Sequence, residues 1–178
     1  MGQRFILTAF GKDRPGIAAD VTEIMYENGC NLEETSMTLL AGQFTLILLF
    51  TAGSADVADP LFKACRRLEQ EKGISAFLRP IEPKETVKSG NGFISRTLHV
   101  EGLDQAGIVY KISRFLADQR INIADLKSTV TASPQSGTAL YVMDILVQIS
   151  TDTDLDAVEK GLSAVADSLN VDIALSAD

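Results

Sequence analysis

The strongest constraint on the fold is an internal repeat. A gapless shift of 91 residues pairs five identical residues: Gly11 with Gly102, Asp13 with Asp104, Gly16 with Gly107, Ile17 with Ile108 and Asn31 with Asn122. The apolar positions between these residues also correspond, with the i, i+4, i+7 and i+8 spacing of a helix that buries one face. We therefore expect two structural units of about 90 residues that share one fold.

Each unit shows the same order of expected elements: strand, helix, strand, strand, helix, strand. In the first unit, β-rich runs indicate strands at residues 4–10, 31–40, 44–50 and 75–80. Pro15 and Asp59-Pro60 mark expected helix starts, and Gly29 and Gly73 mark expected helix ends. In the second unit, strands are expected at residues 95–101, 122–131, 138–149 and 171–175, and helices at residues 106–118 and 154–168.

The segment between the two copies differs in composition. Residues 82–93 include EPKETVKSGNG, which is polar and lacks apolar periodicity, as a linker does. The expected domains are therefore residues 1–81 and 94–178. The element order predicts an α+β fold of two ferredoxin-like βαββαβ sandwiches with antiparallel sheets. Apolar runs at residues 46–50 and 141–147 suggest that the open sheet faces are covered, so we expect the units to pack as a pseudo-symmetric pair.

The overall charge and the cysteines exclude some classes of function. The sequence has 24 acidic and 16 basic residues, and its formal net charge of −8 argues against direct nucleic-acid binding. No apolar run approaches the ~18 residues that span a bilayer, so we expect a soluble protein without membrane contact. Cys30, Cys65 and His99 do not form a metal-ligand pattern, and we expect a reducing, cytoplasmic location with no metal and no cofactor.

The turn GKDRPG, residues 11–16, is the first candidate for a ligand site. It lacks the Lys-Ser/Thr of a phosphate-binding loop, and neither copy contains the G-x-G-x-x-G of a dinucleotide fold. Open backbone N–H groups at a helix N-terminus attract a carboxylate, although the same residues also make an ordinary turn and helix cap. Asn31 favours a ligand, because an amide can donate to a carboxylate and accept from an ammonium group. Together these residues suggest a site for a zwitterionic amino acid.

The stretch TAFGKDRPGIAADVTEIMYENGCNLEE resembles the ACT domain, a regulatory amino-acid-binding module of βαββαβ form. The second copy, GLDQAGIVYKISRFLADQRINIAD, is similar, with Ala106 in place of the usual proline. In that family the amino acid lies near the first strand-to-helix turn, against a neighbouring domain. The resemblance implies ligand-binding residues in both copies: Asp13, Arg14, Pro15, Gly16, Ile17 and Asn31 in the first, and Asp104, Gln105, Ala106, Gly107, Ile108 and Asn122 in the second.

The resemblance also implies a role for the main groups of the first copy. The backbone N–H groups of Gly16 and Ile17 would take the ligand carboxylate, helped by the helix N-terminus. Asn31 would bridge the amino and carboxyl groups of the ligand. Arg14 could assist the carboxylate or remain a solvated charge, and the sequence leaves both roles open.

Two such domains filling the chain resemble the family of glycine cleavage system transcriptional repressors. This likeness implies a regulator of transcription without a catalytic domain. It would sense a small amino acid, with glycine as the candidate, and act through a regulatory protein partner. We also expect a homodimer. Two alternatives stay open: an assembly module that kept the fold and lost the ligand, and a detached regulatory subunit of an amino-acid or folate enzyme.

Catalysis has little support in the sequence. His99 lies within an expected strand and has no obvious Ser or Cys partner. The acidic residues of segment 151–159 lie at the start of an expected helix, where carboxylates interact favourably with the helix dipole. Asp144 is a single acid within an apolar strand, and the sequence offers no explanation for it.

Overall fold

The computed structural model describes residues 2–81, 92–132 and 137–177. The chain divides into two compact units, and the division falls within residues 82–91. The predicted linker, residues 82–93, therefore lies almost wholly outside the described residues, and its last residue, Phe93, begins a strand. The predicted domain limits stay a prediction.

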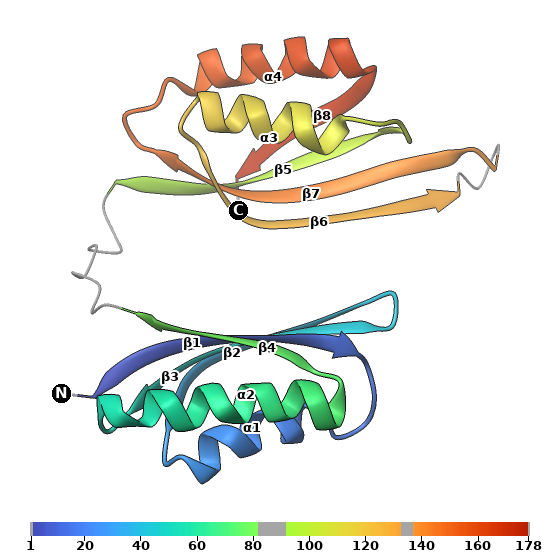
Figure 1. The fold of residues 1–178 in the computed structure, drawn as a ribbon. Coiled ribbons are helices and arrows are strands. Elements are labelled where there is room, and N and C mark those ends of the chain that lie inside the picture. The colour runs from blue at the N-terminus through green and yellow to red at the C-terminus, as the bar shows by residue number, and fades with distance from the viewer. Residues whose placement is uncertain (1, 82–91, 133–136, 178) are drawn as a thin grey trace. The chain divides into compact units, whose positions relative to one another are not determined.

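Unit 1 is a four-stranded antiparallel sheet with two helices on one face (Figure 1). Strands β3 and β1 form the centre of this sheet and β2 and β4 form its edges, in the order β2-β3-β1-β4. The elements, in chain order, are β1 Gln3–Lys12, α1 Ile17–Glu27, β2 Asn31–Leu40, β3 Gln43–Ala52, the short 3-10 helix η1 Ala55–Val57, α2 Ala58–Lys72 and β4 Ser75–Ile81.

Unit 2 repeats this topology with the strand order β6-β7-β5-β8. Its elements are β5 Phe93–Leu103, α3 Ile108–Asp118, β6 Asn122–Ala132, β7 Ala139–Ser150, α4 Leu155–Leu169 and β8 Val171–Ala177. The predicted α+β class and the repeated βαββαβ order of antiparallel ferredoxin-like sandwiches are confirmed. The predicted packing of the two units as a pair stays a prediction.

Glycines in the left-handed backbone region set the helix limits. Gly16, with φ of 87°, and Gly107, with φ of 97°, stand at the N-caps of α1 and α3. A right-handed helix cannot include such a residue, so the two helices begin only after it. The prediction that Pro15 lies in the first turn of α1 is therefore wrong. The prediction that α3 begins at Ala106 is wrong for the same reason. The expected ends at Gly29 and Gly73 are confirmed, because both have positive φ.

Each unit has one core between its sheet and its helices. The alternating residues of β3 that face the helices are buried, and so is the predicted stripe of α1. In the predicted stripe of α3, Ile108, Ile112 and Leu116 are buried, whereas Phe115 is only partly buried. In unit 1, Cys65 belongs to this core and Cys30 packs against it half-buried. Burial raises the pKa of both thiols, so each behaves as a small apolar side chain.

Candidate ligand-binding site

The turn between β1 and α1 is fixed by backbone hydrogen bonds. The Asp13 N–H donates to the Gly42 carbonyl at 2.9 Å, which ties the turn to the β2-β3 hairpin. No side chain caps α1. The sequence predicted that the backbone N–H groups of Gly16 and Ile17 donate to a ligand carboxylate. The Ile17 N–H donates to the Arg14 carbonyl at 3.3 Å, whereas the Gly16 N–H has no backbone acceptor among the described residues. The Ile17 side chain is in the core, so only its backbone could contact a ligand.

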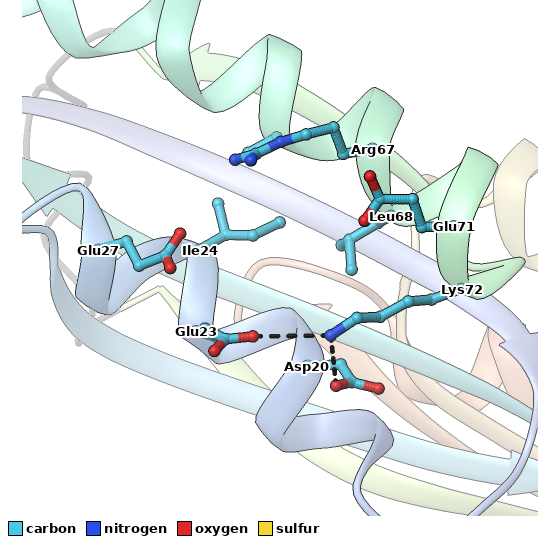
Figure 2. Close-up of a pocket in the computed structure, with 9 residues that line it drawn as sticks. Asp20, Glu23, Ile24, Glu27, Arg67, Leu68, Glu71 and Lys72 are labelled. Atoms are coloured by element: carbon cyan, nitrogen blue, oxygen red, sulfur yellow. Dashed lines mark hydrogen bonds and ion pairs between the residues drawn. The ribbon is translucent and has the colours of Figure 1, made fainter.

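Arg14 is held by an ion-pair cluster. Its Nη2 donates to Asp20 Oδ2 at 2.5 Å, and Lys72 Nζ donates to the other Asp20 oxygen at 2.6 Å. Lys72 also lies 3.6 Å from Glu23, so it reaches from α2 to two acids of α1 (Figure 2). Lys72 and then Arg14 lower the pKa of Asp20, and Asp20 in turn raises the pKa of Lys72. Arg14 thus pairs directly with α1 and is linked to α2 only through Asp20 and Lys72, so it is not a free charge.

The structure separates Asn31 from the turn. The end of β1 pairs with the start of β3, Lys12 lying opposite Gln43, whereas Asn31 pairs with Thr51 at the far end of β3. Thr51 in turn lies opposite Arg4 at the start of β1. Eight residue steps of about 3.3 Å each place the two predicted halves of the site about 26 Å apart along the sheet. One unit therefore does not bring Asn31 to the turn.

Unit 2 repeats this arrangement with different side-chain contacts. The Asp104 N–H donates to the Ala139 carbonyl at 3.3 Å, and the side-chain amide of Gln105 donates to the carbonyl of Leu169 at the end of α4. Ala106 is exposed, and Ile108 is buried in the core. Asn122 again begins the strand at the far end of the sheet, where its Nδ2 donates to Gln148 Oε1 at 2.9 Å.

The two sheet faces that point away from the helices, here called the open faces, have different chemistry. On the open face of unit 1, seven residues surround a cavity of about 350 Å³, here called the sheet-face hollow: Arg4, Ile6, Glu34, Ser36, Ile47, Leu49 and Ile81. Beside it, the rings of Phe10 and Phe77 stack with their centroids 6.0 Å apart. This face is mainly apolar, with charges at its rim.

The open face of unit 2 is charged. Asp144 lies directly opposite His99 in the β5-β7 pairing, and its Oδ1 is 2.7 Å from His99 Nδ1. Lys127 pairs with Asp125 at 2.7 Å on the neighbouring strand, and this contact lowers the pKa of Asp125. Asp144, which the sequence could not explain, is thus 59% exposed in its side chain and paired across strands. Only the strand register reveals this pair.

A second recess lies between α1 and α2 (Figure 2). Six charged residues line it, four acidic and two basic: Asp20, Glu23, Glu27, Arg67, Glu71 and Lys72. In the described part of the chain, this recess included, no group of three or more His, Cys, Asp or Glu side chains is arranged to hold a metal ion. Within the same residues, no helix is long and apolar enough to cross a membrane.

Comparisons with known proteins agree with the fold. Residues 3–78 match the family described as ACT domain. A UPF0237 protein of Methanopyrus kandleri is 30% identical over 77 residues, which cover 43% of this chain and 86% of that protein. The glycine cleavage system transcriptional repressor of Escherichia coli is 25% identical over 166 residues, which cover 93% of this chain and 85% of that protein.

A solved structure extends the likeness to the whole chain. The crystal structure of an unknown protein from Galdieria sulphuraria has a TM-score of 0.82 at 27% identity, and it covers 99% of this chain and 98% of that one. The chain therefore belongs to the ACT-domain family and is related over most of its length to a glycine cleavage system transcriptional repressor.

Proposed function

We propose that this protein is a non-catalytic, cytoplasmic regulator of transcription that binds a small amino acid at the β1-α1 turn and acts through a regulatory protein partner. Glycine is the first candidate ligand, because the relative that matches most of the chain is a glycine cleavage system transcriptional repressor. The observation that carries the proposal is the repeated uncapped helix start. Gly16 and Gly107 adopt nearly the same left-handed conformation, and neither α1 nor α3 has a side-chain cap.

The turn offers groups for both ends of an amino acid. The Gly16 N–H and the positive end of the α1 dipole favour a carboxylate. Asp13 is half-buried, and its carboxylate has no ion-pair partner among the described residues, so it can accept from the ligand ammonium group. Asp13 takes the place that Asn31 had in the sequence-based prediction, since Asn31 lies at the other end of the sheet.

Charge favours a protein partner over DNA. The formal net charge is −8, and residues 91–178 hold 12 acidic and 6 basic groups, a net charge of −6. Such a surface repels nucleic-acid phosphates, so the regulator would act on transcription through another protein, as a homodimer in this proposal. Ligand binding would shift the population of two arrangements only as far as its affinity for them differs.

Calorimetric titration of the full chain with glycine, serine and alanine tests the ligand. Asp13→Asn should abolish the binding of the amino acid that the wild-type chain takes up, whereas Arg79→Gln, on an outer strand, should leave it unchanged. At 100 times its dissociation constant, a ligand should also stabilise the fold by about 2.7 kcal/mol. If none of the three amino acids binds, or if Asp13→Asn binds like wild type, the proposed site is wrong.

A further inference from the structure

We propose that the open face of unit 1 is the contact surface of a homodimer, in which it packs against the open face of unit 1 in a second copy of the chain. This inference rests on the proposed function in one respect, since it gives the homodimer of that proposal its surface. The residues that carry it lie on the four strands and outside the β1-α1 turn. Dimer formation and ligand binding can therefore fail separately.

The centre of this face is apolar and faces solvent. Ile6 on β1 lies directly opposite Leu49 on β3, and Ile47 lies two residues away on the same strand. The stacked rings of Phe10 and Phe77 lie on the same face. The exposed fractions are 39% for Ile47, 45% for Phe10 and 61% for Phe77. Apolar side chains that gather on one face lose free energy in water, so this face favours a cover.

One row of side chains across the sheet is charged at both ends. Strand register places Glu34 of β2 opposite Leu49 of β3. Leu49 lies opposite Ile6 of β1, and Ile6 lies opposite Arg79 of β4. Since β2 and β4 are the edges of the sheet, the row runs from an acid through two aliphatic residues to a base. Among the residues that the structure describes, neither Glu34 nor Arg79 has an ion-pair partner.

This charged row is complementary to itself. A twofold axis that lies between two such faces and parallel to the strands keeps each row at its level and exchanges the outer strands. Strand β2 of one copy then faces β4 of the other, so Glu34 meets Arg79 of the second copy at both ends of the row. The aliphatic centres of the two rows pack together. Sheets that pack face to face lie about 10 Å apart, a gap that long side chains at the edges can bridge.

The neighbouring row adds a protruding ring and a recess. In register across the sheet, this row consists of Ser36, Ile47, Thr8 and Phe77. The same axis places Phe77 of the second copy over Ser36, which lines the sheet-face hollow. The hollow has a volume of about 350 Å³, and a cavity of roughly 150 Å³ can hold a benzene ring. Each copy thus offers a ring and a recess that fits it, as a twofold interface requires.

The open face of unit 2 is a poorer cover for the same surface. By strand register, Ala174 and Ser176 stand at the places of Phe77 and Arg79. At the centre of that face, Asp144 pairs with a histidine. Covering the apolar face of unit 1 with this charged pair would remove the pair from water without a new partner, which is unfavourable. A second copy of unit 1 is therefore the better partner.

Sedimentation velocity of the full chain between about 1 and 200 μM tests the dimer, because this range brackets a micromolar dissociation constant. Four strands about 4.8 Å apart give a face roughly 20 Å wide, which is small for a stable dimer and favours micromolar affinity. One chain has a mass of 19.2 kDa, and we expect a species of twice this mass at the upper end of the range.

Charge exchange locates the surface. Arg79→Glu brings two carboxylates together at both ends of the row and should weaken the dimer about tenfold or more. Adding Glu34→Arg to this variant makes the row complementary again, so the double variant should recover wild-type affinity to within about threefold. Phe77→Ala introduces the residue of unit 2 and should weaken the dimer about tenfold or more. Ser176→Glu, the matched change in unit 2, should leave the dimer unchanged.

The proposal is overturned if the wild-type chain stays monomeric over this range, or if Arg79→Glu and Phe77→Ala, with cooperative thermal unfolding intact, dimerise like wild type. It is also overturned if the double variant dimerises no better than Arg79→Glu. When wild type dimerises but the variants contradict the surface, the homodimer of the proposed function stands and only its surface is wrong. The glycine titration tests the turn independently of all these outcomes.

Discussion

The two units share their strand register but not the chemistry of their open faces. At the centre of the open face, Thr8 lies opposite Ile47 in unit 1, whereas His99 lies opposite Asp144 in unit 2. The helix-covered faces keep aliphatic and aromatic residues in both units. A repeated fold therefore retains the side of the sheet that packs against its helices, because a change of volume there costs stability. The open side is free of this restraint and has diverged.

The divergence separates two kinds of surface within one chain. The open face of unit 1 offers an aliphatic hollow with a charged rim, whereas that of unit 2 offers a contact between His99 and Asp144 across two strands and a Lys127–Asp125 ion pair within β6. The turns that precede α1 and α3 have similar backbone conformations, since each places a left-handed glycine directly before its helix. Their side chains differ, because Arg14 joins an ion-pair cluster while Gln105 donates to the end of α4.

The largest expected difference between the units concerns the repeated glycine at the end of the first strand. A Cβ added at Gly102 would lie 2.6 Å from Val171 Cγ1 and 3.1 Å from its Cα, whereas one at Gly11 would meet its nearest atom, the Gly73 carbonyl oxygen, at 3.1 Å. Gly102→Ala should therefore lower the free energy of unfolding of unit 2 by about 1–3 kcal/mol. Gly11→Ala should cost unit 1 less.

Urea denaturation of the full chain measures both effects. Gly53→Ala is the control, because a Cβ there has no atom within 4 Å and the backbone is not left-handed. Equal losses for Gly102→Ala and Gly11→Ala would show that the repeated glycine has the same role in both units. A wild-type midpoint for Gly102→Ala would contradict the close approach of β5 and β8.

The element order and the fold could be read from the sequence because the repeat supplied two versions of each pattern. Periodicity located the buried stripe of α1, and Gly29 and Gly73 marked real helix ends. The position of Asn31 could also have been deduced. Helix α1 spans 11 residues, or about 16 Å, and returns the chain toward the start of β1, so the residue after it cannot lie beside the turn.

A smaller difference concerns the starts of the second helices. Asp154 caps α4, its Oδ1 accepting from the Ala157 N–H at 3.2 Å, whereas Val57 at the same place before α2 provides no side-chain cap. Asp154→Ala should therefore destabilise unit 2 by about 1 kcal/mol, and Asp154→Asn should restore most of this loss, since asparagine is also a favourable N-cap. Thermal unfolding followed by circular dichroism compares the two variants. An equal loss for both would mean that Asp154 acts through its charge alone.

The chemistry of the open faces could not be predicted from the sequence, because it depends on which residues lie opposite each other in paired strands. Ile47 and Asp144 each lie in a run that looked apolar on both faces, and neither run reveals its cross-strand partner. Strand pairing brings Asp144 to His99 and places Glu34 beside Leu49. Such contacts join residues far apart in the chain, and an error of one residue in register would move every side chain to the opposite face.

The smallest expected effect concerns the ion pairs between helices. In unit 1, Lys72 of α2 joins Asp20 of α1, whereas among the described residues no ion pair joins α3 to α4. The folded pKa of Asp20 is below its ordinary value of 3.8, so this carboxylate stabilises the fold fully above that pH. The contribution is lost as the pH falls through the lowered pKa. Asp20→Asn should thus weaken unit 1 slightly at neutral pH and flatten its loss of stability below pH 3.8.

Acid titration of the free energy of unfolding tests this prediction on wild type and Asp20→Asn. The effect should be small and should shrink at high salt, because all the charges involved are near the surface. Asp118→Asn, which breaks a pair within α3, is the control and should leave the acid dependence of unit 1 unchanged. If Asp20→Asn shows the same acid slope as wild type, the cluster that holds Arg14 does not contribute to the stability of unit 1. Arg14 would then be free to exchange Asp20 for the carboxylate of a ligand at the turn.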